Sequence, residues 1–190
     1  LHTIKSEGKL INLIDKLNHL SNSNLQSSST AIGHTRWATH GNVSVENAHP
    51  LTSEYNVAVV HNGIIENYET IKNKLISEGY NFKSQTDTEV LPHLFSKYIK
   101  LGNNFLQAGR LVLKDIDGAF AFVAMSLDFP NQLFVSRNSS PLAIGLGDKA
   151  NFVGSDAHSI DHLTQRIIYL EDGDHAVIDL KDVKVFNANE

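Results

Sequence analysis

The sequence predicts an α+β fold in one domain, residues 1–190, in which helices cover antiparallel sheets. A chain of this length suits a single domain with a proper hydrophobic core. Apolar residues recur at helical spacing in the first half of the chain. After Gly118 the pattern changes to short β-rich segments separated by turn residues, which is typical of antiparallel sheets. Helices in one half and strands in the other favour helices packed on the faces of sheets.

The predicted helices share an apolar face made by residues three and four positions apart. They are residues 10–20, residues 66–78, a helix that opens at residues 86–89, and residues 104–114. Gly79 follows the second of these helices and is its expected stop. Thr86 and Glu89 have the spacing of a capping box, in which both side chains bind backbone N–H groups.

The predicted strands are short and rich in β-branched and aromatic residues. In the first half, Thr30–Gly33 is a short strand, and Tyr55–Val60 is a strand that ends at His61-Asn62-Gly63, where Asn-Gly is a strong turn signal. In the second half the strands are residues 119–127, 132–136, 142–146, 152–154, 166–170, 176–180 and 183–186. A short helix over residues 156–163 interrupts this series.

Composition excludes several classes of protein. Of the residues, 41% are hydrophobic and 19% are charged, as in ordinary soluble proteins. The net charge of −5 gives no electrostatic reason to expect a nucleic-acid or membrane partner, and no apolar run approaches the roughly 20 residues of a membrane span. The absence of cysteine excludes disulfides, thiolate metal sites and a cysteine nucleophile within these residues. A start at Leu1 is consistent with a chain that begins inside a longer polypeptide.

The pattern of residues from His34 to Gly41 fits neither an amphipathic helix nor an alternating strand. It predicts a functional loop that follows a buried strand. Arg36 offers a fork of donors that matches a carboxylate, and Thr39 and His40 can add hydrogen bonds to the same anion. Asp87, at the start of a helix, can face outward and pair with an ammonium group. A site with both charges is complementary to a free amino acid.

Asn62 and Gly63 add the third component. A side-chain amide N–H beside a glycine backbone N–H is a common way to stabilise an oxyanion in acyl transfer. Glycine also lets the backbone approach a substrate closely. Together with the charged pair, these residues predict acyl transfer at the side-chain carbonyl of an amino acid, with the nucleophile missing.

Each of these residues also has a structural interpretation. Arg36 can pair with a structural acid, Asn62-Gly63 can be an ordinary tight turn, and Asp87 can do no more than favour a helix N-terminus. Trp37 is by default a core or interface aromatic residue.

The ten histidines raise a metal hypothesis. His34 and His40 are six residues apart, and His158 and His162 lie four apart on the predicted short helix. No glutamate stands between the latter pair in an HExxH arrangement, and no cysteine is available. We therefore expect no metal and no cofactor.

Four motifs in order resemble those of one family. They are residues 34–41 (His-Thr-Arg-Trp-Ala-Thr-His-Gly), 61–68 (His-Asn-Gly-Ile-Ile-Glu-Asn-Tyr), 84–89 (Ser-Gln-Thr-Asp-Thr-Glu) and 140–147 (Ser-Pro-Leu-Ala-Ile-Gly-Leu-Gly). As a set they resemble the glutaminase domain of glucosamine-6-phosphate synthases, a class II glutamine amidotransferase domain, from about Gly8 to the end of the chain. Amidophosphoribosyltransferases are the closest alternative family, but they typically lack the Trp-Ala-Thr-His-Gly motif. The resemblance implies an N-terminal-nucleophile hydrolase fold, a four-layer αββα sandwich of two antiparallel sheets between helices.

The resemblance also implies roles for individual residues. Arg36, with Thr39 and His40, would hold the α-carboxylate of L-glutamine, and Asp87 would hold its α-ammonium group. Asn62 and Gly63 would form the oxyanion hole.

A mobile loop is implied as well. Residues 36–42 would close over glutamine. Trp37 would lie at the gate through which ammonia leaves.

Two departures from the family concern the ends of the domain. The family's nucleophile is an N-terminal cysteine, and neither it nor a downstream Tyr-Arg-Gly-Tyr-Asp-Ser motif is present, so the domain is expected to be incomplete at its N-terminus. The sugar isomerase domains that bind fructose 6-phosphate are absent too. We expect a cytoplasmic, homo-oligomeric parent enzyme that makes glucosamine 6-phosphate, while this chain alone does not turn over glutamine. A module that binds glutamine without cleaving it is the alternative.

Overall fold

The computed structural model describes residues 1–20, 29–37, 41–54 and 56–189 of the chain. Three elements come first: α1 (Leu10–Leu20), β1 (Leu51–Thr52) and β2 (Val57–Ile65). The helical part follows, with α2 (Tyr68–Ser77), the 3₁₀ turn η2 (Asp87–Glu89), α3 (Val90–Lys100) and α4 (Phe105–Asp115). The last part holds β3 (Gly118–Ser126), β4 (Leu133–Asn138), β5 (Ala143–Leu146), β6 (Asn151–Gly154), η3 (Ala157–Ser159), β7 (Ile167–Tyr169), β8 (His175–Ile178) and β9 (Val183–Phe186).

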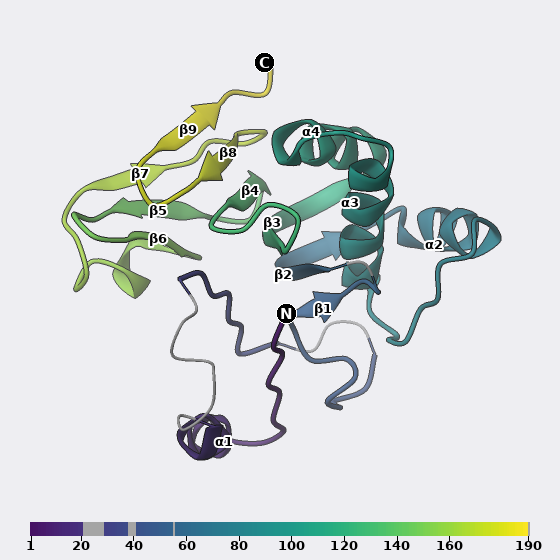
Figure 1. Cartoon of the computed structure of the whole chain (residues 1–190), viewed down its shortest axis with the longest axis horizontal. Coiled ribbons are helices and arrows are strands. Elements are labelled where there is room, and N and C mark those ends of the chain that lie inside the picture. The colour runs from purple at the N-terminus through teal and green to yellow at the C-terminus, as the bar shows by residue number, and fades with distance from the viewer. Residues whose placement is uncertain (21–28, 38–40, 55, 190) are drawn as a thin grey trace.

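The strands form two antiparallel sheets. The large sheet has six strands in the order β1-β2-β3-β4-β8-β9, and the small sheet has three in the order β6-β5-β7. Figure 1 shows α3 and α4 on one side of β2, β3 and β4, and the strands of the small sheet on the other side. The large sheet is therefore the middle layer, with helices on one face and a second sheet on the other.

Side chains of the large sheet alternate between two hydrophobic cores, as the pleat requires. On β2, Val57 and Val59 belong to the core under the helices, while Val60 belongs to the core between the sheets. The first core is dominated by aromatic rings of which the largest fully buried are Phe95, Phe105, Phe122 and Phe134. On the small sheet, Ile144 faces the second core, and a side chain at the next position, Gly145, would meet Thr164 and Ile160. Segment 157–164 thus covers the outer face of β5. The predicted α+β architecture is confirmed.

Most predicted elements are confirmed within a few residues: α1, α2, α3, α4 and the seven strands of the second half. Gly79 ends the second helix at φ +93°, a conformation that glycine adopts without strain. Asn104 caps α4 with a full capping box, because its side chain accepts from the Gln107 N–H while the Gln107 side chain accepts from the Asn104 N–H.

The prediction that the strand ends at His61-Asn62-Gly63 is wrong. β2 continues to Ile65 and stays paired with β3 along its whole length, from Val57↔Ser126 to Ile65↔Gly118. A long partner strand thus overrides the local turn signal of Asn-Gly. Tyr55, the predicted start, lies outside the described residues.

The predicted capping box at Thr86 is also wrong. The Thr86 hydroxyl lies 2.9 Å from the Ser84 hydroxyl, and no side-chain bond caps η2. The Glu89 carboxylate accepts instead from the backbone N–H groups of Lys83 and Ser84. The segment before η2 folds back over Glu89, so both capping side chains are engaged elsewhere.

Three further differences concern short elements. The predicted helix at 156–163 is only the 3₁₀ turn η3, because the chain leaves helical geometry at Ile160, where φ is −129° and the side chain is buried. Thr30–Gly33 is not a strand, since among the described residues neither sheet pairs with it. The two-residue strand β1 was not predicted. No helix in the described ranges is long and apolar enough to cross a membrane.

Candidate functional site

The predicted polar residues converge on one cavity of about 260 Å³. It lies where β2, segment 34–37 and the start of η2 meet. Its lining residues are His34, Arg36, Trp37, His49, His61, Asn62, Gly63, Thr86, Asp87 and Thr88. This volume lies slightly below the range of about 300–1,000 Å³ for typical small-molecule sites, which suits a ligand of amino-acid size.

A second cavity of about 650 Å³ is lined by residues 1–6 and 29–36, among others. It shares His34, Arg36 and His49 with the first, but much of its lining comes from apolar residues such as Leu13 and Leu17. Of the two cavities, only the smaller one is lined by both a basic and an acidic side chain, Arg36 and Asp87. We therefore assign the candidate site to the smaller one.

Gly63 is a glycine for two physical reasons. Its φ of +127° belongs to a region that residues with a side chain rarely adopt. A Cβ built on it would lie 2.0 Å from the carbonyl oxygen of Ala119 on β3. Gly118, which pairs with Ile65 in the same ladder, has the same φ, and a Cβ built on it would lie 2.2 Å from the Ile64 carbonyl oxygen. Because Gly63 has no side chain, its backbone lines the cavity directly.

Asp87 lies in the wall of the cavity and is 3% exposed. Its Oδ2 accepts a hydrogen bond of 2.8 Å from the backbone N–H of Ile65, at the end of β2. The expectation that Asp87 faces outward is therefore wrong, because the carboxylate turns inward against the sheet. A buried carboxylate is stable only with hydrogen-bonding or charged partners, so its place in the cavity wall suits a cationic ligand group.

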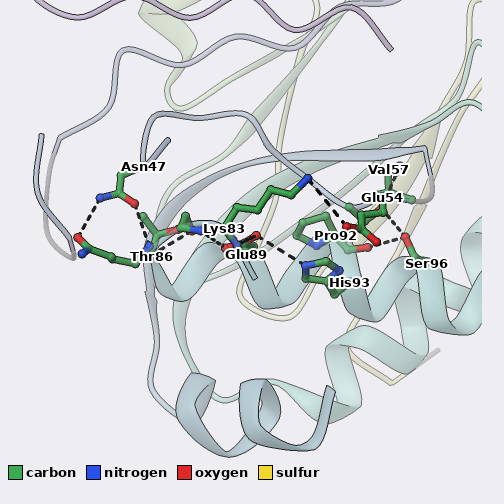
Figure 2. Close-up of polar contacts among 12 residues, drawn as sticks. Asn47, Glu54, Val57, Lys83, Thr86, Glu89, Pro92, His93 and Ser96 are labelled. Atoms are coloured by element: carbon green, nitrogen blue, oxygen red, sulfur yellow. Dashed lines mark hydrogen bonds and ion pairs between the residues drawn. The ribbon is translucent and has the colours of Figure 1, made fainter. Parts of the chain in front are cut away.

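A buried network holds the segment that carries Asp87. Figure 2 shows Glu89 between Lys83 and His93. The two carboxylate oxygens accept from the backbone N–H groups of Lys83 at 2.8 Å and Ser84 at 2.6 Å, and His93 Nε2 lies 3.7 Å away. Burial opposes ionisation, but the nearby imidazole of His93 and the hydrogen bonds from Lys83 and Ser84 outweigh it and lower the pKa of Glu89. The charged carboxylate thus fixes the backbone just before η2.

Asn47, labelled in Figure 2, joins this segment to the loop that follows Arg36. Its Oδ1 accepts from the Gln85 N–H at 2.8 Å, and its Nδ2 donates to Gln85 Oε1 at 3.2 Å and to the Asn42 carbonyl at 3.0 Å. Asn47 is 3% exposed. One buried amide therefore ties the Asp87 segment to the end of the Arg36 loop.

Arg36 lines the cavity and also holds its own loop. Its Nη1 donates to the Asn42 carbonyl at 3.0 Å and its Nη2 to the Gly41 carbonyl at 3.3 Å. These bonds use two of the five N–H donors of a guanidinium. Its backbone has a φ of +43°, which is uncommon outside glycine.

Trp37 lines the cavity but is 89% exposed. This exposure rules out the interpretation of Trp37 as a core aromatic residue of this chain. Thr39 and His40, the other predicted carboxylate ligands in the loop, lie outside the described residues.

Three histidines, His34, His49 and His61, surround the predicted oxyanion residues, and the sequence alone did not single them out for this. The rings of His34 and His49 stack with centroids 4.3 Å apart, and His49 Nδ1 accepts from the His61 N–H at 3.2 Å. Burial, with smaller contributions from neighbouring cations and histidines, lowers the pKa of His49 to about 2, and burial lowers the pKa of His34. The signal was present in part, since His34 and His61 each open a predicted motif.

The imidazole of His61 contacts η2. Its Nδ1 lies 2.9 Å from the Thr88 hydroxyl, and burial lowers its pKa against the opposing attraction of Asp87. A neutral His61 keeps the back wall of the site free of an extra positive charge beside Asp87.

No group of three or more metal-ligating side chains is found within the described part of the chain. His158, one of the pair considered for zinc, is 96% exposed and lies 3.3 Å from Asp161. Because η3 is a single 3₁₀ turn, His158 and His162 do not share a helical face in the way that the spacing predicted.

Comparisons with known proteins show which family this chain resembles. The sequence pattern of the glutamine amidotransferase domain matches residues 34–162, more than half of the chain. The glutamine–fructose-6-phosphate aminotransferase (isomerizing) of Fusobacterium nucleatum is 47% identical over 98% of this chain. The enzymes of that name from Methanosarcina mazei and Legionella pneumophila (strain Paris) are 43% and 40% identical over 98% and 100% of it. The chain spans only 30–31% of the length of these relatives.

Solved structures agree on the fold. The glutamine phosphoribosylpyrophosphate amidotransferase of B. subtilis, complexed with ADP and GMP, superposes with a TM-score of 0.67 at 26% identity, over 82% of this chain and 34% of that one. A structure described as the allosteric regulatory enzyme of purine biosynthesis gives the same TM-score at 29% identity, with the same coverage of 82% and 34%. These likenesses confirm the predicted N-terminal-nucleophile hydrolase sandwich of two antiparallel sheets with helices. The chain belongs to the glutamine amidotransferase domain family.

Proposed function

We propose that residues 1–190 are the glutamine-binding part of a glutaminase domain that lacks its N-terminal end. The polypeptide that carries it would pass ammonia from L-glutamine to fructose 6-phosphate and so make glucosamine 6-phosphate. One observation carries the proposal: Arg36, Asp87 and the Asn62-Gly63 pair line the same cavity of about 260 Å³. The aminotransferases at 40–47% identity support the choice of reaction.

The two ends of an amino acid match the two charged residues. The guanidinium of Arg36 would bind the α-carboxylate, exchanging one or both of its bonds to the Gly41 and Asn42 carbonyls for bonds to the ligand. Asp87, held by Ile65, would bind the α-ammonium group. Thr39 and His40 would add bonds to the carboxylate.

Asn62 and Gly63 would act on the reacting carbonyl. When a thiolate attacks the amide carbon of glutamine, the electron pair of the C=O bond moves onto oxygen. The Asn62 amide and the Gly63 N–H would stabilise that oxyanion, and loss of one such donor typically costs about 2.7–4 kcal/mol in the transition state. The nucleophilic cysteine would lie outside these residues, since the sequence contains none. Trp37, exposed at the rim, would cover the site and gate the exit of ammonia.

The rest of the parent protein is inferred from the relatives. Because the chain spans 30–31% of their length, fructose 6-phosphate would bind to sugar isomerase domains outside it. We propose a homo-oligomeric parent that works in the cytoplasm. An amidophosphoribosyltransferase parent is the competitor, and a phosphoribosyltransferase region encoded downstream would replace our proposal with it.

Calorimetric titration with matched ligands tests the binding roles. L-Glutamine is compared with glutaramate, which lacks the α-ammonium group, and with 4-aminobutanamide, which lacks the α-carboxylate. Arg36→Ala should abolish the advantage of glutamine over 4-aminobutanamide, and Asp87→Asn should abolish its advantage over glutaramate. Arg166→Ala, which removes an exposed guanidinium elsewhere, is the control.

The comparison of two ligands in each variant separates a binding role from a structural role. If Arg36→Ala weakens glutamine and 4-aminobutanamide by the same factor, Arg36 does not bind the carboxylate and its role is structural. If wild-type protein binds none of the three ligands more tightly than L-serine, the chain has no glutamine site and the proposal fails.

Catalysis has its own test. The purified 190-residue chain, checked by intact mass, should release no glutamate from glutamine. Enzyme-like release would overturn the assignment of an external cysteine nucleophile. A non-catalytic glutamine-binding module is the second candidate, favoured by the absence of cysteine. A Met-Cys-Gly start encoded a few tens of codons upstream supports the enzyme, and a start codon at or near Leu1 supports the module.

A further inference from the structure

The imidazole of His34 lies between two hydrogen-bonding partners of the site. Its Nδ1 lies 2.8 Å from the backbone nitrogen of Arg36, and its Nε2 lies 2.8 Å from Oδ1 of Asn62. A backbone N–H can only donate, so Nδ1 accepts and carries no proton. A neutral imidazole then carries its proton on Nε2. The backbone of Arg36 thus selects the tautomer of His34.

This tautomer decides how the Asn62 amide is turned. An N–H on His34 Nε2 can be met only by an acceptor, so the oxygen of the amide faces the ring. The NH₂ end of the amide is then the part of Asn62 that remains for a ligand in the cavity that Asn62 lines. With the opposite turn, the amide would present an oxygen to the oxygen of the ligand, and the two would repel.

The ring of His34 is also fixed in its plane. It stacks on His49 with centroids 4.3 Å apart and an angle of 26° between the planes. His49 is itself held to β2, because its Nδ1 accepts from the His61 N–H, next to Asn62 in the chain. Two histidines from different segments therefore support a single amide.

We propose that His34 is a positioning residue: its Nε2–H holds the Asn62 amide with the NH₂ end toward the cavity. The nature of the ligand rests on the proposed function, but the hydrogen bond itself does not. L-Glutamate is the probe, because an oxygen of its side-chain carboxylate would lie where the carbonyl oxygen of glutamine does. The loss of one hydrogen bond to a charged group should weaken binding about 10- to 100-fold.

Two amide substitutions separate the two ends of the imidazole. His34→Asn places an acceptor near the position of Nδ1, so it can still bind the Arg36 N–H, but it is too short to reach Asn62. His34→Gln places an NH₂ group near the position of Nε2 and can still donate to Asn62. His158→Gln, at a side chain that is 96% exposed, is the control.

Nitrogen-15 NMR of the 190-residue chain tests the proposal. Long-range ¹H–¹⁵N spectra should show His34 as the neutral Nε2–H tautomer. The side-chain NH₂ of Asn62, identified by its loss in Asn62→Asp, should shift on addition of L-glutamate. His34→Asn should remove that shift and weaken binding, His34→Gln should restore both in part, and His158→Gln should change neither.

Two results would overturn the proposal: an Nδ1–H tautomer of His34, or a His34→Asn variant whose Asn62 resonance and glutamate affinity match the wild type. Urea unfolding of each variant separates loss of the bond from loss of the fold. If wild-type protein binds no glutamate, the proposed function fails instead. The tautomer, and the change of the Asn62 NH₂ resonance between wild type and His34→Asn, then still decide whether the hydrogen bond exists.

Discussion

Replacing Gly63 with alanine should be among the most damaging single-methyl changes in this protein. The new Cβ would lie 2.0 Å from the Ala119 carbonyl oxygen, whereas ordinary contacts are 3.4–4 Å. The obstacle is backbone, so no rotation of a side chain can relieve the overlap. The φ of +127° adds conformational strain. β2 and β3 must therefore separate locally for the variant to fold.

The magnitude follows from two contributions. A left-handed backbone costs a residue with a side chain roughly 1–2 kcal/mol. Separation of the strands at this point weakens at least one or two ladder hydrogen bonds, worth about 1 kcal/mol each, and leaves their buried groups unsatisfied. We expect a loss of more than about 3 kcal/mol, out of about 5–15 kcal/mol of stability for an ordinary domain.

Urea unfolding of three glycine variants measures the two contributions separately. Gly33→Ala meets nothing within 4 Å and has no positive φ, so its effect should stay within about 0.5 kcal/mol. Gly79→Ala meets nothing within 4 Å but has a φ of +93°, so it should lose about 1–2 kcal/mol. Gly63→Ala combines strain with overlap and should lose clearly more than either.

A Gly63→Ala variant no less stable than Gly79→Ala would refute this reasoning. The Ala119 carbonyl would then not lie against Gly63, and the register Gly63↔Phe120 would be wrong. The position of the Gly63 backbone in the cavity depends on that register, so the candidate oxyanion site would fall with it.

Three further predictions concern stability. Burial lowers the pKa of His49 to about 2 in the folded chain, whereas its pKa in the unfolded chain is about 6.5. Below pH 6.5 the unfolded chain therefore binds a proton that the folded chain does not. The free energy of unfolding then falls by up to about 1.4 kcal/mol per pH unit. His49→Asn, which keeps an acceptor for the His61 N–H, should therefore flatten the decline of the urea-measured free energy between pH 6.5 and 4.5, and equal slopes would contradict this. Asn104→Ala should lower the free energy of unfolding by about 1 kcal/mol, because it removes the side-chain cap of α4. Asn104→Asp should retain most of that stability, because aspartate still accepts from the Gln107 N–H. Equal melting temperatures of the two variants would exclude the cap. Gly109→Ala should destabilise by about 1–3 kcal/mol, although alanine normally favours a helix, because its Cβ would lie 2.2 Å from the buried ring of Phe134; a gain in melting temperature would contradict this packing.

Local patterns were sufficient for elements whose packing follows their own periodicity. The helices α2 to α4 and the strands after Gly118 were predicted, because their apolar spacing matches the geometry that buries them. The same spacing predicted α1, although its apolar residues Leu10, Ile11, Ile14 and Leu17 are exposed. Prediction failed where a distant partner decides the conformation. Asn62-Gly63 reads locally as a turn, but nine pairs of residues along β3 hold it in a strand.

The same division applies to the candidate site. The motif residues Arg36, Asn62, Gly63 and Asp87 were predicted and lie on one cavity. The direction of Asp87 was not predicted, because it depends on the Ile65 N–H, 22 residues away. Nor was the role of His49, which lies in no motif and lines the site through its stacking on His34 and its hydrogen bond from the His61 N–H.

By itself the sequence determined the α+β class, the set of charged and amide residues that we propose to bind an amino acid, and the absence of a cysteine nucleophile from these 190 residues. These features depend on composition, local spacing and the chemistry of single side chains. Only the tertiary structure decided that β2 runs through Asn62 and Gly63, that Asp87 turns inward, and which end of the Asn62 amide faces His34. These depend on strand register and on hydrogen bonds between segments far apart in the chain, which no local pattern encodes.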